Sequence, residues 1–155
     1  MLNQKTFQKI ISSTPLVSID LCLIHKDSLL LGKRTNEPLK GRWFTPGGRI
    51  MKNERWEDCI ERIAKVELGI NLSHEVFELM GVWNHFYDTS SVSMGISTHY
   101  VNLPHIYIID KLPHILTDDQ HEEMKWFKLM DFLSSCDHHH YMKLYADHII
   151  KNYLK

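Results

Sequence analysis

Apolar and polar residues follow two different periodicities along the chain. The runs LVSIDLCLI and SLLLGKR are almost continuously apolar, and the polar segment His25–Asp27 separates them, so they predict a hairpin-like pair of strands. Residues 55–68 instead repeat their apolar positions at helical spacing and precede Gly69, which predicts an amphipathic helix with a glycine C-cap. The apolar side of this predicted helix consists of Trp56, Cys59, Ile60, Ile63, Val66 and Leu68.

The same rules place further elements on both sides of these segments. Residues 7–11 have helical spacing, and the stretch SSTP stops this short helix. Strands are expected at 76–86, 98–109 and 123–128, and MKLYADHIIKNYL predicts a closing helix. Because strands interleave with helices and nothing marks an internal boundary, residues 1–155 are expected to form one α/β domain, a helix–sheet–helix sandwich.

The composition of the chain mainly excludes classes of protein. The chain has 155 residues and a formal net charge of -1, so no general electrostatic attraction to nucleic acid or to an anionic membrane is expected. No segment approaches the roughly 18 apolar residues of a membrane span, and the N-terminus lacks the apolar core of a secretory signal, so a cytoplasmic protein is expected. Cys22, Cys59 and Cys136 form no C-x-x-C pair and are expected to be reduced core residues.

Two features depart from the regular pattern in a way that suggests chemistry. Asp20 lies inside the first apolar run, where a carboxylate is costly to bury unless it is paired or opens onto a site. Residues 33–49 form a loop rich in Gly and Pro that is long enough to be functional.

A spaced motif joins this loop to the helix that follows. Glu54 follows Gly48 by six positions, Arg62 by fourteen and Glu67 by nineteen, before a closing Gly-Ile. The pattern resembles the Nudix box, the loop–helix–loop signature of enzymes that act on nucleoside diphosphates linked to another group. Its glycines let a backbone carbonyl approach a cation, and its helix projects carboxylates toward that cation. The alternative is an amphipathic core helix after a tight turn, but the segment GRWFTPGG also matches what usually precedes the box.

The motif departs from the usual box at two places. Acids normally stand fifteen and eighteen positions after the glycine, where this chain has Ile63 and Val66. Glu67 alone remains of the carboxylate cluster, so the helix cannot assemble several divalent ions, and ordinary metal-activated attack on phosphorus is disfavoured.

One branch of the family shows the same reduction, the GDP-mannose mannosyl hydrolases. The segments STPLVSID, LLLGKRTNEP, GRWFTPGGR, GVWNHFYD, STHYV and DDQHEEMKW all resemble that branch and cover about residues 12 to 128 in the same order. The resemblance implies a Nudix-type α/β/α sandwich with a mixed β-sheet, and a homodimer. It also implies hydrolysis of GDP-mannose, or another GDP-hexose, at the anomeric carbon with inversion, releasing GDP and the free hexose.

The resemblance implies one metal ion per active site, Mg²⁺ or alternatively Mn²⁺. The Gly47 carbonyl, Glu67 and Gln120 would hold it, with diphosphate oxygens and water completing the octahedron. Without the family, Glu67 is an exposed acid at a helix end and Gln120 is a solvated loop residue.

The diphosphate is expected to bind basic side chains. Arg34, Arg49 and Arg62 are the candidates, because guanidinium groups match phosphate oxygens and stabilise departing GDP. Arg62 has an alternative role, in which it holds the box together by pairing with Glu54 or Glu67. Tyr100 resembles a family residue that donates to the leaving diphosphate, although a tyrosine in a strand is more often part of the core or the sheet surface.

The remaining candidates belong to the sugar side of the site. Asp20 and His85 correspond to family residues near the hexose, where a carboxylate stabilises an oxocarbenium-like transition state. His121, in the polar segment TDDQHEE, is the candidate general base, with a solvated loop histidine as the alternative. The run of histidines at 138–140 is a weaker candidate, because three successive side chains cannot face one ion.

Two rival functions stay open from the sequence. One is conventional pyrophosphate cleavage, which would give GMP and a hexose phosphate. The other is a non-catalytic nucleotide-sugar sensor, in which the reduced box binds ligand without turnover. The preferred hexose among mannose, glucose and fucose also stays open.

Overall fold

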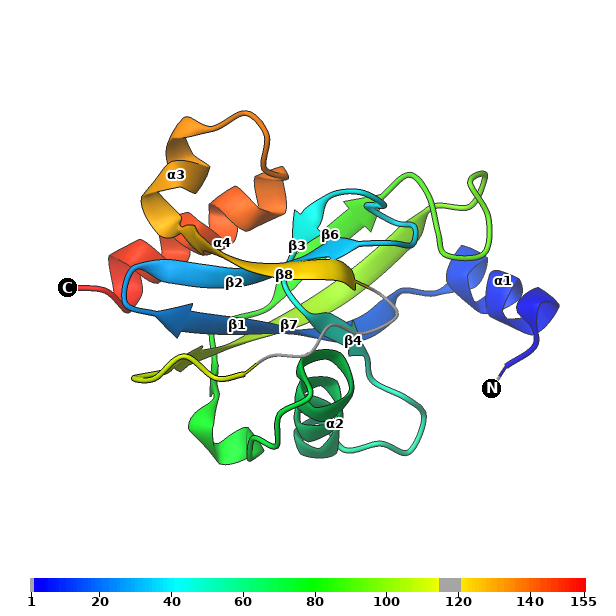
Figure 1. The fold of residues 1–155 in the computed structure, drawn as a ribbon. Helices are drawn as coiled ribbons and strands as arrows, with labels where there is room; N and C mark the ends of the chain where they lie inside the picture. The colour runs from blue at the N-terminus through cyan, green and yellow to red at the C-terminus, as the bar shows by residue number, and fades with distance from the viewer. Residues whose placement is uncertain (1, 115–120) are drawn as a thin grey trace.

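A single sheet lies between helices on its two faces, with α2 on one side and α3 and α4 on the other, while α1 lies beyond one end (Figure 1). The computed structural model describes residues 2–114 and 121–155, apart from the side chains of residues 121 and 122. The arrangement confirms the expected α/β/α sandwich. The elements are α1 (Gln4–Ser13), β1 (Leu16–His25), β2 (Ser28–Arg34), β3 (Trp43–Phe44), β4 (Gly47–Arg49), α2 (Trp56–Leu68), the 3-10 helix η1 (His74–Val76), β5 (Glu78–Leu79), β6 (Trp83–Tyr87), β7 (Thr98–Ile108), β8 (His121–Lys128), α3 (Leu129–Ser134) and α4 (His140–Asn152).

The sheet is mixed, as expected. Its strands follow the order β3-β2-β1-β7-β5, with β4 paired to β1, β6 to β7 and β8 to β2. β1 and β7 run parallel, whereas β2 and β4 are antiparallel to β1. This topology places β1 at the centre of the sheet and brings the short β4, which carries the motif glycines, alongside it.

The central strand β1 is buried on both faces, which explains its nearly continuous apolar sequence. Ile19, Leu21 and Leu23 point into the core beneath α2, whereas Cys22 and Ile24 point into the core beneath α3 and α4. Because side chains alternate along a strand, Asp20 shares the face of Cys22 and lies on the α4 side.

The single strand expected at 76–86 is wrong. This segment instead forms η1, β5 and β6, and both strands pair with β7. Leu79 pairs with His105 and Trp83 with Asn102, so three residues between these positions on one side lie opposite two residues of β7. The interruption falls opposite Pro104, which has no N–H for a ladder hydrogen bond, so the local pairing is broken by a bulge.

Three residues expected in the core lie at the surface. Val66 is 61% exposed and Trp56 is 46% exposed, because the side of α2 that faces the sheet carries Ile60, Ile63 and Glu67 instead. Cys136 is also exposed, in the connection between α3 and α4, whereas the other two cysteines are buried as expected. The short elements β3, β4 and α3 have too few residues to produce a readable period, and the sequence patterns missed them.

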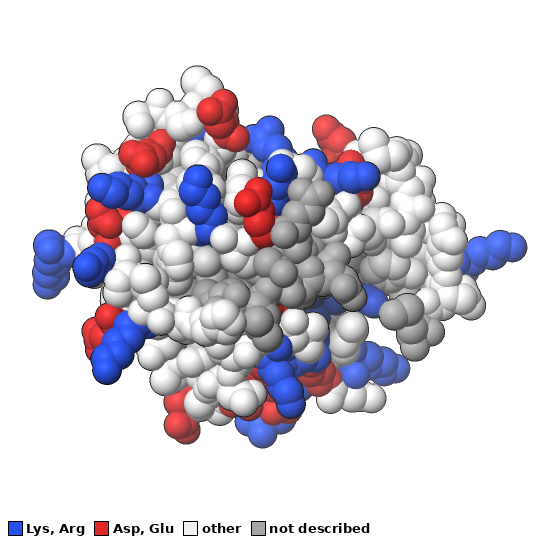
Figure 2. Space-filling model, in the orientation of Figure 1, with Lys and Arg blue, Asp and Glu red and all other residues white. Residues whose placement is uncertain are grey.

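Charged residues of both signs are interspersed on the face of the molecule shown in Figure 2. This distribution matches the small net charge of the chain and leaves that face without a broad surface of one sign. Among the helices of the described chain, none has the length and apolar character needed to cross a membrane.

Candidate active site

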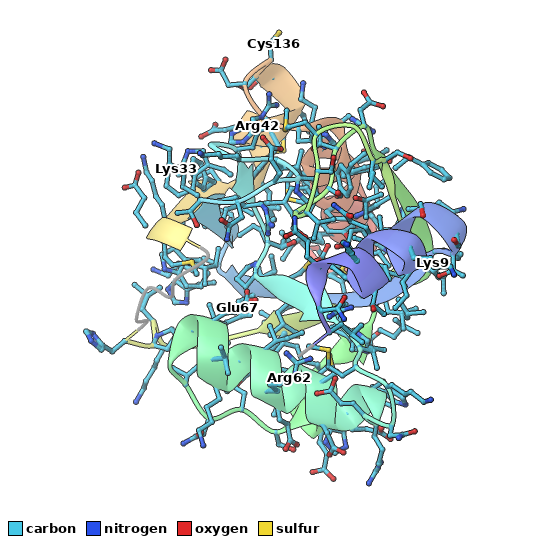
Figure 3. All side chains as sticks on the ribbon, turned by 90° about the vertical axis from the view of Figure 1, so that its right-hand side faces the viewer. Lys9, Lys33, Arg42, Arg62, Glu67 and Cys136 are labelled. Carbon is cyan, nitrogen blue, oxygen red and sulfur yellow. The ribbon has the colours of Figure 1, made fainter. Side chains whose placement is uncertain are left out.

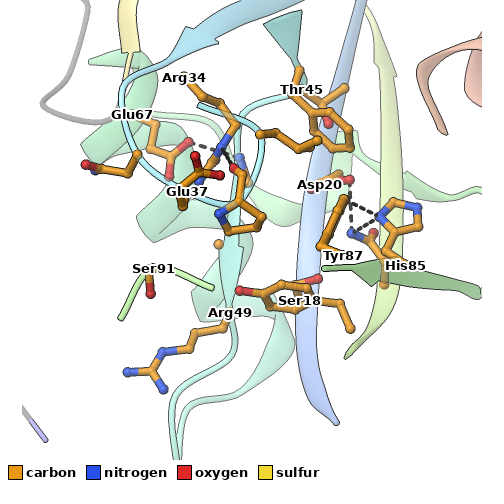
Figure 4. Close-up of a pocket in the computed structure, with 18 of the residues that line it drawn as sticks. Ser18, Asp20, Arg34, Glu37, Thr45, Arg49, Glu67, His85, Tyr87 and Ser91 are labelled. Carbon is orange, nitrogen blue, oxygen red and sulfur yellow. Dashed lines mark hydrogen bonds between the residues drawn. The ribbon is translucent and has the colours of Figure 1, made fainter. Parts of the chain in front are cut away.

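A cavity of about 680 Å³ opens between β1, β4, β6, β7 and the loop that follows β2. Figure 4 shows its lining, with charged side chains on one side and the pair Asp20 and His85 on the other. Eight of the ten residues singled out in the sequence line this cavity. They are Asp20, Arg34, Gly47, Arg49, Arg62, Glu67, His85 and Tyr100.

The other two candidates sit at the edge of what the structure describes. Gln120 lies outside the described residues. His121 begins β8, and its backbone pairs with that of Arg34, a residue of the cavity wall. The backbone of the candidate base is therefore next to the cavity, while the position of its imidazole stays a prediction.

Gly47 and Glu67 form the centre of the motif. Glu67 lies on the sheet-facing side of α2, is 3% exposed, and accepts a hydrogen bond of 2.9 Å from the Gly47 N–H through Oε2 (Figure 3). A Cβ at position 47 would lie 2.7 Å from the carbonyl oxygen of Ile19 and would overlap the Asp20 carboxylate. Only glycine therefore allows β4 to approach β1 this closely.

The backbone of Gly47 fits a role as a cation ligand. In the antiparallel pairing of β4 with β1, the Leu21 N–H donates to Pro46 and the Ile50 N–H donates to Val17, so Gly47 occupies a non-hydrogen-bonded position opposite Asp20. Its carbonyl oxygen is consequently directed away from β1. A backbone carbonyl beside a buried carboxylate is a donor set suited to a hard divalent ion.

Side chains of the described residues do not complete a metal site by themselves. Within residues 2–114 and 123–155 no group of three or more His, Cys, Asp or Glu side chains could hold an ion. An ion at Gly47 and Glu67 would therefore need further ligands, such as ligand phosphates and water. This requirement agrees with a single ion whose binding depends on the substrate.

The two departures from the usual box have structural explanations. Ile63 is 1% exposed and packs in the core between α2 and the sheet, with Gly48 above it. Val66 points into solvent. An acid at position 63 would be buried among apolar side chains at a high cost in free energy. An apolar residue is therefore favoured at this core position.

Arg62 is engaged in holding the loop before α2. Its Nε donates to Glu54 Oε1 at 2.6 Å and its Nη2 to Glu54 Oε2 at 2.9 Å, while Nη2 also donates to the carbonyl of Arg49 at 2.9 Å. The hydrogen bonds from Arg62 lower the pKa of Glu54. Of the two roles expected for Arg62, this geometry supports the one that holds the box together.

Replacement of either partner of this pair is expected to destabilise the fold modestly. Arg62→Gln and Glu54→Gln should each lower the free energy of unfolding by about 1 kcal/mol, a value reduced by the partial exposure of Arg62, and the double variant should be no worse than the single ones. Chemical denaturation measures this, with Arg55→Gln as the control because the Arg55 side chain, which pairs with Glu57, is exposed. Additive losses in the double variant would show that the two residues act separately.

Arg34 and Arg49 present guanidinium groups to the same cavity. Arg34 donates through Nε to the carbonyl of Pro38 at 2.9 Å, which fixes its orientation. The guanidinium of Arg49 lies 4.2 Å from the ring centre of Phe7 in α1, a cation–π contact. Tyr100 on β7 lines the same cavity, and burial raises its pKa, so its hydroxyl stays a donor. This side of the cavity is suited to an anionic ligand.

The opposite side of the cavity is a buried polar network around Asp20. Asp20 Oδ2 accepts hydrogen bonds from the Tyr145 hydroxyl at 2.7 Å and from Asn102 Nδ2 at 3.0 Å. Burial raises the pKa of Asp20 to about 6, although these hydrogen bonds limit the rise. Asp20 is therefore mainly ionised at neutral pH, in surroundings where its charge is poorly screened.

His85 lies beside Asp20 as a neutral ring. It is 1% exposed, and its imidazole stacks on Tyr141 with ring centres 4.0 Å apart. Its Nδ1 lies 3.2 Å from the Tyr87 hydroxyl. Because burial lowers the pKa of His85 to about 3, this residue is a weak base near neutral pH and is better suited to hydrogen bonding than to proton abstraction.

Sequence reasoning missed two members of this network. Asn102 is a polar residue inside a buried strand, the same signal that singled out Asp20, and it could have been found in that way. Tyr145 has the apolar spacing of the closing helix and gives no sign of its polar contact. Ser18 and Thr45 also line the cavity, and Thr45 lies close enough to Asp20 for its hydroxyl to help limit the rise in the pKa of that carboxyl.

The cavity of this α/β/α domain has basic side chains on one side, suited to an anionic ligand, and the Gly47 carbonyl with Glu67, suited to a hard cation. The buried carboxylate of Asp20 lies on the opposite side of the cavity. The model of the NUDIX domain matches residues 14–149 of the chain, which therefore belongs to the Nudix family. Members of this family are hydrolases of nucleotide derivatives and typically use divalent metal ions.

Individual relatives agree with this assignment. The chain is 39% identical over 122 residues to the low-salt glycan biosynthesis protein Agl8 of Haloferax volcanii, covering 79% of this chain and 76% of that protein. It is 29% identical over 144 residues to an ADP-ribose pyrophosphatase of Methanocaldococcus jannaschii, covering 91% and 74% of the two chains.

Solved structures give the same fold. A MutT NUDIX hydrolase from Burkholderia pseudomallei matches with a TM-score of 0.70 and 25% identity, covering 88% of this chain and 99% of that one. A MutT/nudix family protein from Enterococcus faecalis matches 74% of this chain with a TM-score of 0.61 and 25% identity, and this chain spans 44% of its length.

Proposed function

We propose that this protein hydrolyses a GDP-hexose, with GDP-mannose as the first candidate, by attack of water at the anomeric carbon. The observation that carries the proposal is the arrangement of acids: of the α2 side chains at the usual acidic positions, Ile63 is in the core, Val66 is in solvent, and Glu67 alone faces the cavity. The other buried carboxylate of the cavity, Asp20, lies on β1, away from α2.

The residues divide into a diphosphate side and a sugar side. Arg34 and Arg49 bind and orient the diphosphate, and Tyr100 donates a hydrogen bond to it as GDP leaves. Gly47 and Glu67, with Gln120, would hold one Mg²⁺ ion, for which Mn²⁺ is an alternative. When bound, this ion neutralises charge that develops on the leaving diphosphate.

On the sugar side, Asp20 stabilises the positive charge that develops at the anomeric carbon. Its carboxylate is ionised, buried and held in place by Tyr145 and Asn102, so its electrostatic effect on a nearby oxocarbenium-like centre is large. His85, neutral and fixed by its stack on Tyr141, is suited to binding a hexose hydroxyl group. Inversion requires water to attack from the face opposite the diphosphate.

His121 is proposed as the base that activates this water. His121→Gln is expected to lower kcat by about 10²-fold and to alter the acid limb of its pH profile, with a smaller effect on KM, because a general base acts in the transition state. Steady-state kinetics between pH 5 and pH 9 would measure this. A variant that keeps both the rate and the acid limb would refute the assignment.

Relatives support two candidate reactions. Similarity to a glycan biosynthesis protein agrees with a sugar-nucleotide substrate, whereas similarity to an ADP-ribose pyrophosphatase favours the rival cleavage at phosphorus. Incubation with GDP-mannose and Mg²⁺, followed by identification of products, separates them. GDP and mannose support the proposal, GMP and mannose 1-phosphate indicate the rival, and binding without products indicates a sensor.

A further inference from the structure

Helix α4 contacts the cavity residue Asp20 through Tyr145. Tyr145 is fully buried in the core on the α4 side of the sheet, where its ring packs edge-on against Trp83 at 5.5 Å. Its hydroxyl continues past this apolar packing to Asp20 Oδ2, at 2.7 Å. The two residues are 125 positions apart in the sequence, so the contact exists only in the folded molecule.

This contact controls the orientation of the Asp20 carboxylate. Two donors from different elements, the Tyr145 hydroxyl on α4 and Asn102 Nδ2 on β7, bind the same oxygen, Oδ2. The other oxygen, Oδ1, is turned toward the backbone of Gly47, where a Cβ would overlap it. With Oδ2 held from the side of the core, Oδ1 is left on the side of the cavity that Gly47 lines.

We propose that Tyr145 is a positioning residue that fixes the Asp20 carboxylate with Oδ1 directed into the cavity. This inference rests on the proposed function, in which that carboxylate stabilises charge at the sugar carbon. Without the hydroxyl, Oδ2 loses the shorter of its two hydrogen bonds and keeps the one from Asn102, so the carboxylate can rotate more freely about its Cβ–Cγ bond. A small displacement of a charged group from its productive position is enough to lower a rate substantially.

The surroundings of the pair support a role for the hydroxyl beyond packing. If position 145 served only to fill the core, phenylalanine would pack there as well as tyrosine. The tyrosine hydroxyl is instead placed against a charged oxygen. Charged or titratable groups face Asp20 from several elements, and Tyr145 donates the shortest hydrogen bond that it receives. These groups are His85 and Tyr87 on β6, Arg34 on β2, Tyr100 on β7, Cys22 on β1 itself and Tyr145 on α4.

The test is a kinetic double-mutant cycle. Tyr145→Phe retains the ring and removes the hydroxyl, and is expected to lower kcat by about 10- to 100-fold while KM changes by less than about twofold. In an Asp20→Asn background the same replacement should change the residual kcat by less than about twofold, because the group on which it acts is already gone. Tyr153→Phe, which removes a hydroxyl at the C-cap of α4 whose partner is the exposed Glu78, is the control and should keep the wild-type kcat.

Outcomes of this cycle separate the inference from the proposed function. An unchanged kcat in folded Tyr145→Phe, or an equal loss in both backgrounds, would overturn the positioning role, and circular dichroism melting verifies that each variant is folded. Products are identified in the same reactions. If the wild type releases GMP, or no product, the proposed function fails and this inference falls with it. If it releases GDP and hexose while Tyr145→Phe keeps its kcat, only the inference fails.

Discussion

Glu67→Gln is expected to lower kcat by about 10³-fold or more, with the fold intact. Glu67 is the buried acid of α2 that faces the cavity, and a neutral amide would bind a divalent ion much more weakly than a carboxylate. The glutamine oxygen can still accept the hydrogen bond from the Gly47 N–H, so the contact between α2 and β4 should persist. The activity at increasing Mg²⁺ concentrations, with thermal unfolding as a check of folding, measures this effect.

The matched control is Glu61→Gln on the same helix. Glu61 bonds to His74 on the outer surface, 13 residues along the chain, and should be dispensable for the reaction. If Glu67→Gln retained near-normal activity and an unchanged dependence on Mg²⁺, the ion would have to bind elsewhere.

Asp20→Asn is expected to have opposite effects on activity and stability. The rate should fall by about 10²- to 10³-fold, because a neutral amide no longer stabilises positive charge at the sugar carbon. The free energy of unfolding at neutral pH should rise, by up to about 3 kcal/mol, because burial raises the pKa of Asp20 from 3.8 to about 6. Chemical denaturation in the presence of EDTA measures the stability of the metal-free protein.

The pH dependence of this stabilisation follows from the direction of the pKa shift. Between about pH 4 and pH 6 the native state binds a proton at Asp20 that the unfolded chain does not, so Asp20 makes the wild type less stable as the pH rises through this range. The advantage of Asp20→Asn should therefore be greatest above pH 6 and fade toward pH 4. An Asn variant that is less stable than the wild type at pH 7 would show that the carboxylate serves the fold rather than the reaction.

The main elements of the fold could be predicted because burial leaves strong patterns. The apolar run that contains Asp20 is β1, and helical spacing before Gly69 gives α2 with the correct cap, in which Gly69 has a φ of 68°. The segment 76–86 could not be predicted, because its division depends on the lack of an N–H at Pro104 in a strand that pairs with it only in the tertiary structure. Val66 is apolar like a core residue but does not lie on the buried face of α2, since half a helical turn, about two residues, separates the two faces of a helix.

The candidate site was predicted largely through its resemblance to a family, and the structure adds the physical reasons. Gly47 is required by the close approach of β4 to Asp20, and Ile63 by the packing beneath Gly48. The partner of Arg62 was one of two expected glutamates, and the hydrogen bonds identify Glu54. Tyr145 could not be found from its sequence pattern, because the helical period reports burial but does not say which buried side chain carries a hydrogen bond.

The position of the bond that breaks is the central claim, and hydrolysis of GDP-mannose in ¹⁸O-labelled water tests it most directly. Attack at the anomeric carbon predicts one label in the released mannose and none in GDP, as measured by mass spectrometry of both products. Label in a phosphate group, with GMP among the products, would contradict the account and assign the protein to cleavage at phosphorus.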